Sequence, residues 1–170
     1  MSVRPILLSP DPVLKRPSAP VSTDDPRVRL IIQDMLDTLA VSPGVALAAP
    51  QIGESVQIIV VDVSRKNGEQ GHGLVVLLNP RIVDRDDQRI IREGCLSVPD
   101  YTGNVLRYGR AVVEGMTQEG RPRTIIASGF EALAFQHEVD HLHGMLFLDR
   151  IQSLSTDLFR RRQGGTGKTR

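Results

Sequence analysis

Residues 128–144 read SGFEALAFQHEVDHLHG, and this stretch decides how the rest of the chain is interpreted. Ser128 followed three residues later by Glu131 has the pattern of a capping box, which predicts that a helix begins here. Gly144 is well placed to end that helix. The segment therefore predicts one helix of about four turns in the last third of the chain.

Two histidines of this helix have the spacing of metal ligands. His137 and His141 are four residues apart, so both imidazoles lie on one helix face and can reach one metal ion. Glu138 lies about 100° around the helix from His137, where a carboxylate can act as a general base without being a ligand. The alternative is an ordinary helix whose His and Glu face solvent. We favour the metal because the motif lies in a capped helix whose other face is apolar.

A third protein ligand is needed, because a catalytic metal site usually has three protein ligands and a water. Some zinc proteases place a third His six residues after the second, but that position here is Phe147. No Glu follows His141, so a downstream Glu ligand is excluded. Cys95, the only Cys of the chain, is the upstream candidate, since a thiolate beside two imidazoles leaves one open coordination position. Its alternative role is a small buried apolar residue.

A third segment, residues 44–53, is small, apolar and almost without charge, with the single side-chain amide of Gln51. Small residues let the backbone of a substrate approach closely, as in the pairing of a peptide with a sheet edge. The same composition suits a buried loop beneath a sheet. The residues of this segment taken alone leave both interpretations open.

The remaining elements indicate an α+β fold with a largely antiparallel sheet, because helices and strands do not alternate regularly. Five prolines make residues 4–21 an extended arm or a set of turns. Asp25 and Pro26 predict the start of a helix that ends near residues 40–42. β-branched and apolar runs predict short strands at residues 56–63, 74–78, 90–91, 110–114 and 124–127.

Composition excludes several classes of protein. The chain has 170 residues, which suits one domain, and a lone Cys cannot form a disulfide scaffold. The 21 Lys and Arg against 20 Asp and Glu give a net charge of +1, which argues against a DNA-binding face. No apolar run is long enough to span a membrane, and the first residues show no apolar signal core. We therefore expect a cytoplasmic protein without a membrane or DNA partner.

The three segments together resemble the three signature motifs of the peptide deformylase family, in the family's order. The second motif, Glu-Gly-Cys-Leu-Ser, is matched in full by residues 93–97, and the third, Gln-His-Glu-x-Asp-His, by residues 136–141. The first motif, Gly-x-Gly-Leu-Ala-Ala-Pro-Gln, is matched by residues 44–51 except that Ala46 replaces the second Gly. With similar flanking segments, the resemblance extends from about residue 5 to residue 151.

The resemblance implies a hydrolase that removes the formyl group from the N-terminal formyl-methionine of nascent bacterial polypeptides. It implies that Cys95, His137 and His141 bind the metal. Glu138 would take a proton from the attacking water and later deliver one to the leaving amine. The side-chain amide of Gln51 and the backbone N–H of Leu96 would stabilise the oxyanion.

The resemblance also implies an α+β fold with mostly antiparallel sheets packed around a central metal-binding helix. We expect one catalytic domain over residues 1–151 and a basic, flexible tail over residues 152–170. The family favours Fe(II), with Zn, Ni or Co as substitutes in purified protein. The basic tail indicates either a contact with ribosomal RNA or simply a solubilising end.

Helix geometry predicts a substrate pocket. One apolar wall comes from the residues before His137 on its own face, namely Phe130, Leu133 and Ala134. The opposite wall and the peptide-binding edge come from Gly44, Val45, Ala46 and Ile91. An apolar slot between these walls suits a methionine side chain, although the same residues could be plain core.

The departure at Ala46 puts substrate range in doubt more than reaction type. An alanine is costly there if the backbone φ is positive or if its Cβ meets the substrate. Two alternatives follow from Ala46: a deformylase with an altered range of formyl substrates, and a binding protein without turnover. A metallopeptidase is a third alternative, because the same metal, water and Glu can also hydrolyse peptide bonds. The Cys ligand and the missing downstream ligand count against the metallopeptidase.

Overall fold

The computed structural model describes residues 2–161. Six strands form one antiparallel sheet, in the order β1-β2-β3-β4-β5, with β6 pairing separately with β4. The mixed α+β fold with an antiparallel sheet is confirmed. The strands are β1 (Ala46–Ala48), β2 (Ile58–Val61), β3 (Val75–Cys95), β4 (Val98–Met116), β5 (Pro122–Ser128) and β6 (Leu158–Arg160).

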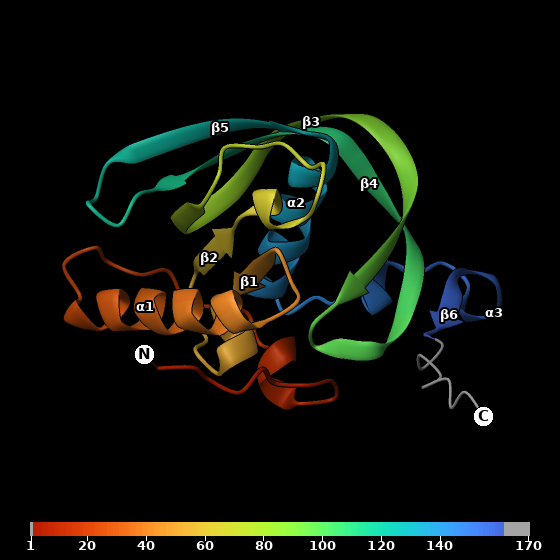
Figure 1. The fold of residues 1–170 in the computed structure, drawn as a ribbon, viewed down its shortest axis with the longest axis horizontal. Helices are drawn as coiled ribbons and strands as arrows, with labels where there is room; N and C mark the ends of the chain where they lie inside the picture. The colour runs from red at the N-terminus through yellow and green to blue at the C-terminus, as the bar shows by residue number, and fades with distance from the viewer. Residues whose placement is uncertain (1, 162–170) are drawn as a thin grey trace, which may run out of the picture.

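The sheet is dominated by one long hairpin, made of β3 and β4 and closed by a turn at Leu96 and Ser97. β3 has 21 residues and β4 has 19, so the expectation of separate short strands at residues 90–91 and 110–114 is wrong. The sequence hides this hairpin because residues 83–90 are all exposed and show no alternation. Register shifts bend the pair, and Figure 1 shows it arching over α2.

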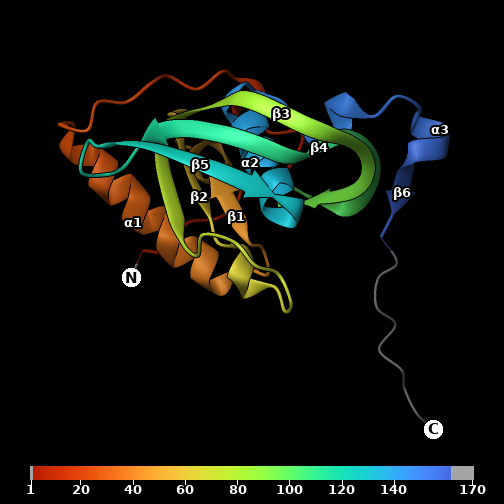
Figure 2. The same cartoon turned by 90° about the horizontal axis from the view of Figure 1, so that it is seen from above.

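Two long helices lie on different sides of the strands. α1 (Pro26–Val41) begins where predicted, and the Asp25 carboxylate accepts a hydrogen bond from the Arg27 N–H. α2 (Gly129–Leu142) crosses the middle of the molecule (Figures 1 and 2), and Gly144 follows it with a φ of +71°. The shorter helical elements are η1 (Pro12–Lys15), η2 (Ala49–Ile52), η3 (Val63–Arg65), η4 (Phe147–Arg150) and α3 (Leu154–Asp157).

The predicted capping box does not form. Ser128 makes no side-chain hydrogen bond to the helix. Glu131 instead binds His72, in the loop between β2 and β3. One carboxylate oxygen accepts the His72 backbone N–H at 2.7 Å, and the other lies 2.8 Å from the His72 Nδ1. The predicted start of the helix is therefore correct, but the predicted capping interaction is wrong. The Glu131 carboxylate binds a loop that is distant in sequence instead of the start of its own helix.

Most residues of α2 are buried. Apolar residues of β1, β2, β3, β4 and β5 pack with Phe135 and other α2 residues into one cluster. The polar motif residues of α2 are buried too, with Glu138 3 % and His141 1 % exposed. A buried charged or polar group is costly unless it has partners, so the motif must be held by polar neighbours.

The first part of the expected tail contains two short elements. Within residues 152–161 the chain forms α3 and β6, and β6 pairs with β4 through Leu158↔Gly103 and its two neighbours. The remainder of the predicted tail, residues 162–170, lies outside the described residues. No helix in residues 2–161 has the length and apolar character needed to cross a membrane.

Candidate metal centre

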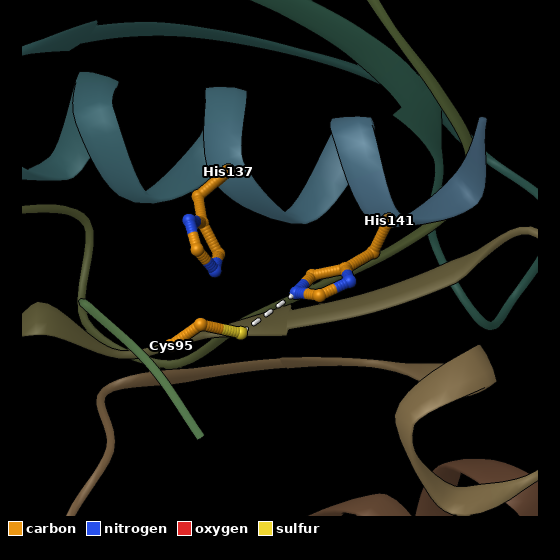
Figure 3. Close-up of side chains that lie close together, drawn as sticks. All are labelled: Cys95, His137 and His141. Atoms are coloured by element: carbon orange, nitrogen blue, oxygen red, sulfur yellow. Dashed lines mark hydrogen bonds between the residues drawn. The ribbon is translucent and has the colours of Figure 1, made fainter. Parts of the chain in front are cut away.

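Three side chains from two distant elements converge beside α2. Ligand atoms of Cys95, His137 and His141 all lie within 4.8 Å of one another. Figure 3 shows both imidazoles reaching from α2 towards the thiol. The Cys95 Sγ lies 3.3 Å from His141 Nε2, and the two rings meet edge to face with centroids 4.9 Å apart. The residues that the sequence nominated as ligands are therefore brought together.

The histidine ligands and the cysteine ligand are positioned in different ways. The i, i+4 spacing on α2 is enough to put the histidines on one face. Cys95 is the last residue of β3, directly before the hairpin turn. Its Sγ accepts the backbone N–H of Ser97 at 3.4 Å and faces the side-chain amide nitrogen of Gln51 at 3.7 Å. Cys95 is thus positioned by contacts between segments far apart in the sequence.

The donor set fits one divalent metal ion. A thiolate and two imidazoles are borderline-soft ligands that zinc and iron accept. His137 Nδ1 contacts Glu93 Oε2 at 2.9 Å, which leaves its Nε2 to face the cluster. Burial opposes a positive charge on His137, but the negative charges of Cys95 and Glu93 outweigh it and raise its pKa. A site that stabilises one cation in this way also suits a metal cation.

A buried network of charges holds these ligands from behind. Arg107 on β4 donates to both oxygens of Glu93 at 2.7 and 2.9 Å, and to Asp140 at 2.7 Å. Arg150 donates to both oxygens of Asp140. Although burial raises the pKa of Glu93, hydrogen bonds and charges from His137 and Arg107 lower it to about 2. Glu93 is therefore a permanent anion that orients the His137 ring.

Arg107 is a residue of the site that was not predicted from the sequence. It lies on the buried face of β4, where Val105, Ala111 and Val113 alternate as core residues. A charged residue in phase with such a pattern is a signal of a buried ion pair, because an unpaired charge would be too costly there. The partner itself could not be named, since it depends on how β3 and α2 meet β4.

Gln136, quoted as a motif residue, has a structural role that the sequence did not reveal. Its side-chain amide donates to the Tyr108 carbonyl at 2.7 Å and accepts the Tyr108 N–H at 3.1 Å. β5 pairs with β4 only from Arg110 onward, so this edge of β4 has no strand partner at Tyr108. Gln136 takes the place of a strand there and fixes α2 against the hairpin.

Glu138 is buried beside the metal ligands. Its Oε2 has no hydrogen-bond partner within residues 2–161, which is unusual for a carboxylate that is only 3 % exposed. Burial raises the pKa of Glu138 to about 7. A carboxylate with a free oxygen and a pKa near neutrality is suited to accept and return a proton.

Gln51 and Leu96 lie next to Cys95. The Gln51 Oε1 accepts the Ala48 N–H at 2.9 Å, which turns its amide nitrogen towards Ser97 and Cys95. Leu96 lies in the hairpin turn and packs so closely on Gly44 that a Cβ there would come within 2.7 Å of a Leu96 methyl. The first and second motifs are therefore packed directly against each other.

A cavity of about 660 Å³ opens next to the metal ligands. Ala46 forms part of its wall as the first residue of β1, and it is not among the described residues with positive φ. The backbone therefore accepts an alanine at this position without strain. Every residue predicted to form the substrate pocket lines this cavity, namely Gly44, Val45, Ala46, Ile91, Phe130, Leu133 and Ala134.

Comparison with known proteins gives the family. Residues 3–157 match the sequence profile of polypeptide deformylase. The chain is 43% identical to the peptide deformylase of Syntrophobacter fumaroxidans over 162 residues, covering 95% of this chain and 94% of that protein. It is 42% identical to the peptide deformylase of Rhizobium meliloti, covering 100% and 97% of the two chains.

Solved structures agree with this result. A crystal structure of a peptide deformylase from Legionella pneumophila superposes with a TM-score of 0.82 at 38% identity, covering 90% of this chain and 88% of that one. The Met-Ala-Ser-bound class I type b peptide deformylase of Acinetobacter baumannii has a TM-score of 0.81 at 34% identity, covering 89% and 100% of the two chains. The chain therefore belongs to the polypeptide deformylase family, and its Cys/His/His cluster fits a metal-dependent enzyme of that family.

Proposed function

We propose that this protein removes the formyl group from the N-terminal formyl-methionine of nascent polypeptides by metal-dependent hydrolysis. The observation that carries the proposal is the position of Glu138, a buried carboxylate with one free oxygen, beside three residues able to hold a metal. The Met-Ala-Ser peptide bound to the Acinetobacter baumannii relative is what remains when the formyl group leaves such a substrate.

Cys95, His137 and His141 would hold the metal. When bound, such a metal makes water a nucleophile near neutral pH and polarises the carbonyl that is attacked. We propose Fe(II) in the cell, with Zn, Ni or Co as substitutes in purified protein. The anion of Glu93 would keep His137 in the orientation and tautomer that a ligand needs.

Glu138 acts as the general base and then as the general acid. It accepts a proton from the attacking water while the formyl carbon is attacked, and it delivers a proton to the leaving α-amine as the C–N bond breaks. The side-chain amide of Gln51 and the backbone N–H of Leu96 donate to the oxyanion that develops on the formyl oxygen. Because Gln51 is held by Ala48 and Ser97, its donor does not need to reorganise during the reaction.

The apolar cavity holds the methionine side chain. Phe130, Leu133 and Ala134 on α2 line it, and so do Val45 and Ile91. The rest of the peptide lies along one edge of β1, around Ala46. The other edge of β1 pairs with β2. We place this reaction in the bacterial cytoplasm, where nascent chains with formyl-methionine are made.

The direct test compares two peptides with anaerobically purified, metallated protein. Formate release is measured on formyl-Met-Ala-Ser, and release of free methionine on unformylated Met-Ala-Ser. We expect formate release from the first and no cleavage of the second. Cleavage of the unformylated peptide would indicate a metallopeptidase, and binding of the formyl peptide without formate release would indicate a non-catalytic binding protein.

A further inference from the structure

The rim of the cavity carries positive charge, whereas its floor carries the acidic groups. Four basic side chains line the cavity, namely Arg65, Lys66, Arg92 and Arg161, and all four residues are exposed. The acidic residues among those lining the cavity are Glu93 and Glu138, which are 8 % and 3 % exposed and belong to the metal centre. A peptide that enters from solvent therefore meets cations first.

Three of the four cations already have partners. Arg65 donates to the carbonyls of Gly44 and Ser42 at 3.2 and 3.0 Å, which fixes the chain before β1. Lys66 lies 3.9 Å above the Phe130 ring. Arg92 lies 3.4 Å above the ring of a β6 residue. These side chains have roles in holding the cavity wall.

Arg161 differs from the other three cations. Its backbone N–H donates to the Asp100 carbonyl at 2.7 Å, which continues the pairing of β6 with β4 and carries the side chain to the cavity. Its guanidinium lies over Gly94, the residue before Cys95, so closely that a Cβ on Gly94 would collide with Nη2. Within residues 2–161 the Arg161 side chain makes no hydrogen bond and no ion pair.

We infer that Arg161 is a specificity-determining residue, which binds an acidic side chain of the substrate at the second or third position after the formyl group. This inference rests on the proposed function. With the formyl carbon at the floor, the following residues of an extended peptide must leave past the rim, at about 3.3 Å per residue. A guanidinium without a partner is well suited to a carboxylate, and it repels Lys and Arg at the same place.

The test measures kcat/KM for amidated peptides with Glu, Gln or Lys at residue 2 or at residue 3, where formyl-methionine is residue 1. The metallated full chain is compared with Arg161→Gln, Arg161→Lys and the matched control Arg160→Gln. Arg160 is the neighbouring exposed residue of β6 and does not line the cavity. Thermal unfolding of each variant verifies that β6 remains in place.

At one of the two positions we expect the parent to prefer Glu over Lys by about fivefold at low salt, the upper range for an exposed ion pair. Arg161→Gln should abolish the preference, while Arg161→Lys and Arg160→Gln should retain it. Added salt should weaken the preference for Glu in the parent. A purely structural role of Arg161 would not explain such a dependence on salt. An equal Glu-to-Lys ratio in the parent and in Arg161→Gln would overturn the inference. Absence of formate from the uncharged Gln peptides would instead overturn the proposed function.

Discussion

The floor and the rim of the cavity use charge in opposite ways. At the floor, Glu93 is buried and bound by Arg107 and His137, so its charge is fixed in place. At the rim, exposed cations lie in solvent, and Arg161 has no partner within the described residues. Charge that is buried and paired can orient groups for chemistry, whereas an exposed charge without a partner, such as that of Arg161, mainly biases what approaches. Changes at the floor should therefore affect reaction and stability far more than changes at the rim.

The largest effect is expected from the metal ligands. Cys95→Ala or His141→Ala should remove the bound metal and reduce formate release to background, because two ligands cannot complete the site. Metal content per chain and formate release measure this. His143→Ala is the matched control, since His143 is exposed and, within the described residues, its Nδ1 hydrogen-bonds only with the Val139 carbonyl. Full metal content in both ligand variants would show that the metal is held elsewhere.

The next effect is on stability. Arg107→Met leaves Glu93 and Asp140 buried with one partner fewer each, which should lower the free energy of unfolding by about 3–5 kcal/mol. Arg81→Met on the same hairpin removes an ion pair whose Arg81 and Glu114 side chains are 74% and 38% exposed, and should cost less than about 1 kcal/mol. Urea unfolding of both variants makes the comparison. Equal losses of unfolding free energy would mean that burial does not determine how much each ion pair contributes to stability.

A catalytic effect of similar size is expected at Gln51. Gln51→Leu removes the amide donor, so formate release should fall about 10²–10³-fold while metal content stays unchanged. The variant also leaves the Ala48 N–H without its acceptor, and thermal unfolding measures that separate loss. A rate within about threefold of the parent would exclude Gln51 from oxyanion stabilisation.

The smallest effect concerns Asp149, a partly exposed carboxylate that does not line the cavity. Burial raises the pKa of Asp149, but hydrogen bonds from Lys15 and the Leu146 N–H lower it further than burial raises it. A lowered pKa means that Asp149 stabilises the fold fully above about pH 4, the pKa of an unfolded Asp, and less as the pH falls below it. The parent should exceed Asp149→Asn in stability by less than about 1 kcal/mol at pH 7. This difference in unfolding free energy should become smaller below pH 4. A difference that becomes larger there would contradict a lowered pKa of Asp149.

The sequence predicted what local geometry controls. The start of α1 at Asp25, the two histidines on one face of α2 and the turn at Gly144 follow from spacing within one segment. The apolar pocket residues were found for the same reason, since Phe130, Leu133 and Ala134 share a helix face with His137.

Features that join distant segments could not be predicted from local patterns. The exposed run at residues 83–90 concealed the long hairpin, and His72 took the carboxylate that a capping box would have used. Arg107 and Arg161 were missed because their roles depend on where β3, α2 and β6 meet. The role of Cys95 was inferred from the missing third ligand and from the family motif, because no pattern within its own strand shows that it meets the two histidines.

The most direct test of the account is formate release by Glu138→Gln, measured beside the parent with the metal content of both recorded. We predict that the variant keeps its metal, because Glu138 is not among the proposed ligands. Formate release should fall by about 10²–10⁴-fold, because the proton transfer is lost. A variant with equal metal content and a rate within tenfold of the parent would contradict the claim that Glu138 carries the proton at the floor of this cavity.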